Sequence, residues 1–164
     1  MHEFTHILGF SKHFFEKHYK NIVQKQDKHG INRLYLNSPI LLAKARKYFN
    51  CESLEGVELE NQGGNGTEAS HWEARILLGE YMCGTTRTEE EVISEFTLAY
   101  LEDTGYYKAN YYTGGLMRYG KNKGCSFIKE KCVNNYEINP NDQLDEQKML
   151  NIFINEFKIR SAEH

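Results

Sequence analysis

Residues 1–13 of the chain read MHEFTHILGFSKH and contain the pattern H-E-x-x-H. His2 and His6 lie four residues apart, and Glu3 follows the first of them. On a helix, residues four apart lie on the same face, so both imidazoles can reach one metal ion. The Glu3 carboxylate then stands near a water bound to that metal, where it can act as a general base. This stretch therefore predicts a zinc-binding helix.

A catalytic zinc needs a third protein ligand as well as one open position. The metzincin pattern H-E-x-x-H-x-x-G-x-x-H fits at Gly9, but its third histidine falls on Lys12. His13 comes one residue late, and a slip of one residue points a side chain elsewhere. We therefore expect His13 on a solvated or half-buried face. His71, which follows the glycine-rich loop 63–66, is the better candidate.

Met82 follows His71 in the segment EYMCG, residues 80–84. Metzincin sites have a methionine turn beneath the zinc, and Met82 is placed to form one. The residues alone leave plainer interpretations open. A histidine beside Trp72 is often a core residue, and a lone methionine often only fills space in a core.

Local signals predict a helix-rich chain with some strand. Residues 1–20 read as helix, interrupted or ended near Gly9, and Ser38-Pro39 starts a second helix as N-cap and first helical residue. A capping box at Thr88 and Glu91 and a C-cap glycine at Gly105 bound a helix over 88–104. The expected buried stripes are Leu42, Ala45 and Phe49 in the second helix, and Val92, Phe96, Ala99 and Tyr100 in the third.

The remaining segments carry weaker signals. Residues 56–70 read as a short strand followed by a glycine-rich loop, and residues 71–80 as a short helix or an irregular segment. Residues 105–140 read as loops with little regular structure, and the stretch 142–160 as a last helix.

Composition limits the function classes. The 164 residues are 40% hydrophobic with a net charge of −3, which fits one globular domain and suggests no nucleic-acid partner. There is no apolar run of about 18 residues that predicts a transmembrane helix. Residues 1–13 do not read as a signal peptide, and residues 142–164 show no lipid-anchor signal. Four cysteines leave two disulfides, one disulfide or free thiols open.

Five stretches in order, residues 2–10, 53–73, 80–84, 97–111 and 119–132, resemble the leishmanolysin family of metzincin-type zinc metalloproteases. The resemblance implies an α+β, helix-rich fold that corresponds to the C-terminal part of a metzincin-like catalytic domain. It implies a start at the zinc-binding helix, without the N-terminal sheet subdomain. Residues 1–140 are then the partial catalytic domain, and residues 141–164 a C-terminal helix and tail.

The resemblance also implies roles for residues of this chain. His2, His6 and His71 are expected to bind one Zn²⁺, Glu3 to be the general base and Met82 to form the methionine turn. The implied activity is a metalloendopeptidase that hydrolyses peptide bonds of protein or peptide substrates by Glu-assisted attack of zinc-bound water. The resemblance also implies an extracellular or cell-surface location.

The same resemblance suggests how the cysteines pair. Cys51 and Cys125 form a disulfide in this view, Cys132 lacks its partner in this chain, and Cys83 stays free.

Two other functions remain open at this point. One is a non-catalytic zinc-binding or cell-adhesion fragment of a leishmanolysin-like protein. The other is a helical domain in which H-E-x-x-H occurs by accident.

Overall fold

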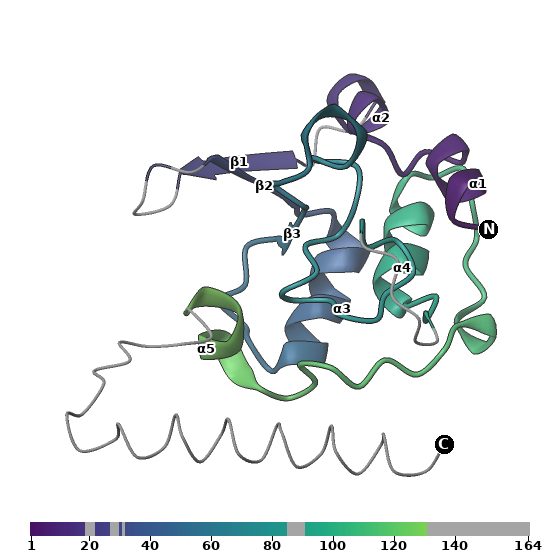
Figure 1. Cartoon of the computed structure of the whole chain (residues 1–164). Coiled ribbons are helices and arrows are strands. Elements are labelled where there is room, and N and C mark those ends of the chain that lie inside the picture. Colours follow the sequence, from purple (N-terminus) through teal and green to yellow (C-terminus); the bar gives the residue numbers. More distant parts are fainter. Residues whose placement is uncertain (19–21, 27–29, 31, 85–90, 131–164) are drawn as a thin grey trace, which may run out of the picture. The chain divides into compact units, whose positions relative to one another are not determined.

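The chain begins with two short helices separated by a glycine. The computed structural model describes residues 1–18, 22–26, 30, 32–84 and 91–130, and these belong to the compact unit Met1–Glu130. In it, α1 spans His2–Ile7 and α2 spans Lys12–His18 (Figure 1). Gly9 between them has φ +120°, a conformation that glycine adopts more readily than other residues. The predicted break near Gly9 is confirmed.

A small antiparallel sheet follows, with strand order β1-β2-β3. Strand β1 spans Ile22–Gln26, β2 Asn32–Leu36 and β3 Val57–Glu58. Leu36 of β2 pairs with Ile22 on one side and with Val57 on the other, and its side chain is fully buried. The strand predicted within 56–70 is therefore confirmed as β3. The hairpin of β1 and β2 was not predicted.

Two helices, α3 (Pro39–Phe49) and α4 (Glu95–Asp103), lie side by side and carry much of the core (Figure 1). The predicted start of α3 at Ser38-Pro39 is confirmed. The buried face of α3 differs from the predicted one at one position, since Leu41 is fully buried and Leu42 only partly. The buried side chains of the pair are Leu41, Ala45, Tyr48 and Phe49 from α3, and Phe96, Thr97, Ala99 and Tyr100 from α4. Helices and an antiparallel sheet together confirm the α+β class.

The predicted start of the third helix is wrong. Helix α4 begins at Glu95, and its N-cap is Ser94, whose Oγ accepts hydrogen bonds from the N–H groups of Phe96 and Thr97. Val92 lies outside the helix and pairs with Glu80 in a parallel bridge, so backbone pairing overrides the local helical signal there. Thr88 lies outside the described residues. Gly105, with φ +78°, follows the end of α4 as predicted.

The start of α3 is capped by α4 rather than by its own N-cap residue. Ser38 makes no side-chain cap, whereas the Asp103 carboxylate accepts hydrogen bonds from the N–H groups of Ile40 at 3.0 Å and Leu41 at 2.8 Å. A carboxylate also suits the positive end of a helix dipole. The end of α4 is thereby fixed to the beginning of α3.

Within residues 105–130, where little regular structure was expected, the structure has two short elements: a 3-10 helix at Tyr111–Thr113 and helix α5 (Gly124–Lys129). The segment 71–80 is irregular. A disulfide joins Cys51, just after α3, to Cys125 of α5, as the resemblance implied, and Cys83 is free and buried.

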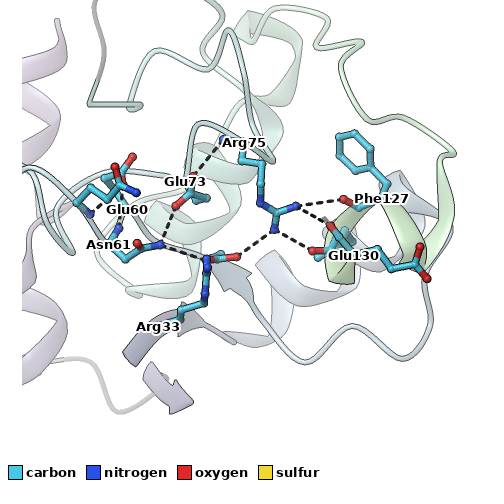
Figure 2. A network of polar contacts seen from close by, with 10 residues as sticks. Arg33, Glu60, Asn61, Glu73, Arg75, Phe127 and Glu130 are labelled. Atoms are coloured by element: carbon cyan, nitrogen blue, oxygen red, sulfur yellow. Dashed lines mark hydrogen bonds and ion pairs between the residues drawn. The ribbon is translucent and has the colours of Figure 1, made fainter. Parts of the chain in front are cut away.

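Arg75 secures the end of α5 (Figure 2). Its guanidinium donates hydrogen bonds to the carbonyl oxygens of Phe127, Ile128 and Glu130 and forms an ion pair with Glu58. The carbonyls of Phe127 and Ile128 are among those that the end of a helix leaves without backbone partners.

Among the described residues, no helix is long and apolar enough to cross a membrane. The helix predicted for 142–160 and the segment 141–164 lie outside the described residues.

Candidate metal centre

Three histidines from distant parts of the sequence meet at one point. His2 and His6 lie one turn apart on α1, and their Nε2 atoms are 3.2 Å from each other. The Nε2 atom of His71 lies 3.1 Å from that of His2. The possible ligand atoms of all three residues lie within 4.8 Å of one another. The structure thus brings together the three residues proposed as ligands from the sequence.

His71 lies near α1 because the loop before it, residues 60–70, has its two ends hydrogen-bonded to each other. Leu59 and Trp72 form an antiparallel bridge, and the Glu60 N–H donates to the carbonyl of His71 at 2.8 Å. Within the loop, the Ala69 N–H donates to the carbonyl of Glu60. Trp72 is completely buried, so the residue beside His71 is anchored in the core.

Polar contacts hold both ends of this loop (Figure 2). The Asn61 side-chain amide donates to Glu58 and to Glu73, and the half-buried Arg75 reaches Glu58. Glu58 is only 3% exposed and also pairs with Arg33. The chain segments before and after the His71 loop are therefore bound to each other.

Each imidazole is oriented by a backbone carbonyl through its other nitrogen. Nδ1 of His2 is 2.5 Å from the carbonyl oxygen of Tyr81, Nδ1 of His6 is 2.7 Å from that of Phe10, and Nδ1 of His71 is 2.9 Å from that of Thr67. A carbonyl oxygen can only accept, so Nδ1 carries the proton in each ring. In the neutral rings, all three Nε2 atoms then carry a free lone pair directed at one place.

This donor set fits a zinc ion. The Nε2 atom of His2 is 3.1 Å from that of His71 and 3.2 Å from that of His6, and lone pairs that face each other across such distances repel unless a cation lies between them. Zn–N bonds of about 2.0–2.1 Å in a tetrahedral site separate two nitrogens by roughly 3.4 Å, close to these distances. Burial, and then the neighbouring His6 and His2, lower the pKa of His71 and favour the neutral, ligating form, although the Thr67 bond and Glu3 act the other way.

The turn at Gly9 positions His6. The Gly9 carbonyl accepts a hydrogen bond from the Tyr100 hydroxyl at 2.6 Å, and Phe10 is completely buried against Trp72. The Phe10 carbonyl, held in this way, is the acceptor for His6.

We expect Gly9→Ala to lower the free energy of unfolding by about 1–3 kcal/mol, because a non-glycine residue is strained at this φ. An added Cβ meets Phe14 at an ordinary 3.5 Å, so the cost comes from the backbone. Urea denaturation monitored by fluorescence measures it. Gly66→Ala is the matched control: Gly66 has no positive φ and open space around it, so its substitution should change little. Equal effects at the two positions would contradict this explanation.

Segment 80–84 passes beside the histidines and contains the buried Met82. The Tyr81 carbonyl holds His2, and the Tyr81 hydroxyl is 2.5 Å from the hydroxyl of Thr5 on α1. A Cβ on Gly84 would lie 3.4 Å from the His71 ring. The segment that contains Met82 thus adjoins two of the three histidines.

Glu3 is exposed on α1, the helix that carries His2 and His6, and its charge is among the influences on the pKa of His71, which it raises. His13 is exposed on α2 and is not part of the cluster.

The sequence did not indicate which groups orient the imidazoles. The acceptors are backbone carbonyls of Tyr81, Phe10 and Thr67, and a carbonyl leaves no residue-specific signal. Glu80 was also missed, although a carboxylate in the apolar context of residues 76–83 is a signal that could have been followed.

Comparison with known proteins places the chain among the leishmanolysins. A sequence model of the family described as leishmanolysin matches residues 1–145. The chain is 40% identical over 137 residues to a leishmanolysin homolog of Crithidia fasciculata, covering 80% of this chain and 20% of that protein.

Two further relatives are also leishmanolysins or leishmanolysin-like by name. A leishmanolysin-like peptidase of Drosophila pseudoobscura pseudoobscura is 47% identical over 102 residues, which are 62% of this chain and 15% of that protein. Leishmanolysin of Leishmania chagasi is 35% identical over 137 residues, 80% of this chain and 22% of that protein. The chain therefore spans less than a quarter of the length of these relatives. By the extent of these matches, the chain belongs to the leishmanolysin family.

Proposed function

We propose that this chain carries the zinc centre of a metalloendopeptidase, with His2, His6 and His71 as ligands and one Zn²⁺ per chain. One observation carries the proposal: three imidazoles, each fixed through Nδ1 to a backbone carbonyl, turn their Nε2 atoms toward one point. Membership of a family whose relatives are named peptidases supports it.

The chemistry follows from the donor set and from Glu3. A zinc ion held by three imidazoles is a Lewis acid that polarises a carbonyl and lowers the pKa of water to about 7. Glu3 lies between two of the ligands in sequence and is exposed, so its carboxylate can take a proton from an attacking water and return it to the leaving amine. Tyr81, Phe10 and Thr67 keep the three rings in place during this cycle. We assign Met82 to the methionine turn, since its segment adjoins His2 and His71.

We further propose protein or peptide substrates and an extracellular or cell-surface location. The disulfide between Cys51 and Cys125 supports the location, because disulfides persist mainly in oxidising compartments.

Peptide cleavage by the purified 164-residue chain tests the activity. We expect cleavage of an unstructured fluorogenic peptide that a chelator abolishes and added zinc restores. Zinc binding without any cleavage would favour the alternative of a non-catalytic zinc-binding fragment.

A further inference from the structure

Glu80 is a carboxylate enclosed in the core beside the metal centre. Glu80 is 1% exposed. Its carboxylate accepts four hydrogen bonds. Oε1 accepts from the Thr97 hydroxyl at 2.5 Å, the Ser94 hydroxyl at 2.9 Å and the Ser94 N–H at 3.3 Å. Oε2 accepts from the Met82 N–H at 2.5 Å. Burying a carboxylate is costly, so a fully satisfied one in this position needs an explanation.

The explanation lies in a single peptide group. The Met82 N–H, which donates to Glu80, and the Tyr81 carbonyl, which accepts from His2, belong to the same peptide unit. The order of contacts is therefore carboxylate, peptide N–H, peptide carbonyl, imidazole Nδ1. Hydrogen bonds in such a chain polarise one another, so a negative charge at one end makes the carbonyl a stronger acceptor at the other.

A second branch reaches the other side of the centre. The Trp72 indole N–H donates to the Thr97 hydroxyl at 2.8 Å, and that hydroxyl donates to Glu80. The Trp72 backbone N–H donates to the Met82 carbonyl at 3.0 Å. Trp72 follows His71 directly in the sequence. Glu80 is thus hydrogen-bonded to segment 80–84, which holds His2, and is linked through Thr97 to Trp72, which follows His71.

We propose that Glu80 is a positioning residue that tunes zinc affinity by acting on His2 through the Tyr81–Met82 peptide group. Metal-ligating histidines commonly donate their other N–H to a carboxylate or a carbonyl, and these outer partners strengthen the ligand. Here one peptide group separates the carboxylate from the imidazole. The proposal rests on the zinc centre proposed above and assigns Glu80 no direct contact with substrate.

Glu80→Gln separates this role from simple packing. An amide oxygen can keep the three donors at Ser94 and Thr97, but the amide NH₂ then faces the Met82 N–H, and two donors cannot bond. We expect a 10- to 100-fold lower affinity for Zn²⁺, the range seen when outer partners of metal ligands are removed. Competition against a chromophoric chelator at pH 8 measures the affinity of the 164-residue protein.

Asp103→Asn is the matched control. Asp103 is a half-buried carboxylate that accepts hydrogen bonds from the N–H groups of Ile40 and Leu41 at the start of α3. In the part of the chain that the structure describes, no hydrogen bond joins its side chain to the three histidines or to segment 80–84. We expect it to lower the stability of the fold while leaving zinc affinity within about twofold of the unaltered protein. Equal zinc affinity in the two variants, with the unaltered protein binding zinc, would overturn the role of Glu80. If the unaltered protein binds no zinc, the proposed function fails first.

A measurement on the unaltered protein covers the case in which Glu80→Gln does not fold. In a zinc titration followed by amide resonances, coordination of His2 should strengthen its Nδ1 bond to Tyr81 and move the Met82 amide proton downfield. The Cys83 amide, which donates instead to the backbone carbonyl of Glu80, should move much less. A Met82 resonance that moves no more than that of Cys83 would contradict the proposed relay.

Discussion

His71→Ala is expected to lower zinc affinity by more than about 100-fold, because loss of an outer partner alone costs 10- to 100-fold and His71 supplies a ligand atom itself. Its Nε2 lies 3.1 Å from that of His2, and without it only the two nitrogens of α1 remain. A catalytic zinc site has three protein ligands, so two do not hold the ion firmly. Isothermal titration with Zn²⁺ on the purified variant measures the change.

His13→Ala is the control for this experiment. His13 is also a histidine near H-E-x-x-H, but it is exposed on α2 and lies outside the cluster. Its removal should leave zinc affinity unchanged. Equal losses in the two variants would show that the third ligand has been assigned to the wrong residue.

Glu3→Ala is expected to keep the metal and to lower kcat/KM for peptide cleavage by about 10²- to 10⁴-fold, the usual contribution of a general base. The three imidazoles do not depend on the Glu3 side chain, whose carboxylate is exposed, so neither the fold nor zinc affinity should suffer. Steady-state kinetics and zinc content are measured on the same preparation.

Glu16→Ala, an exposed carboxylate on α2, is the control and should leave both quantities unchanged. If Glu3→Ala loses its zinc, Glu3 has a structural role and the assignment as general base is wrong.

The sequence predicted the parts of the site that depend on side-chain chemistry. His2, Glu3 and His6 follow from helical spacing within α1, and the break after α1 follows from Gly9. His71 was a candidate from its place after the loop 63–66, and the resemblance then assigned it the ligand role. The pairing of Cys51 with Cys125 came from resemblance alone, since nothing local joins residues so distant in the sequence.

The sequence did not predict features that arise from backbone pairing at long range. Val92 looked helical, yet its pairing with Glu80 moves the start of α4 to Glu95. Likewise Ser38 looked like the cap of α3, but Asp103 of α4 supplies that cap. Local propensity is a weak guide wherever tertiary contacts offer a better partner.

We propose that three imidazoles of this chain form one zinc site, and the zinc content of the purified protein tests this claim. We expect about one zinc per chain after the purified 164-residue protein is incubated with Zn²⁺ and dialysed against metal-free buffer. A ratio near zero, in a protein whose circular dichroism shows it to be folded, would contradict the claim.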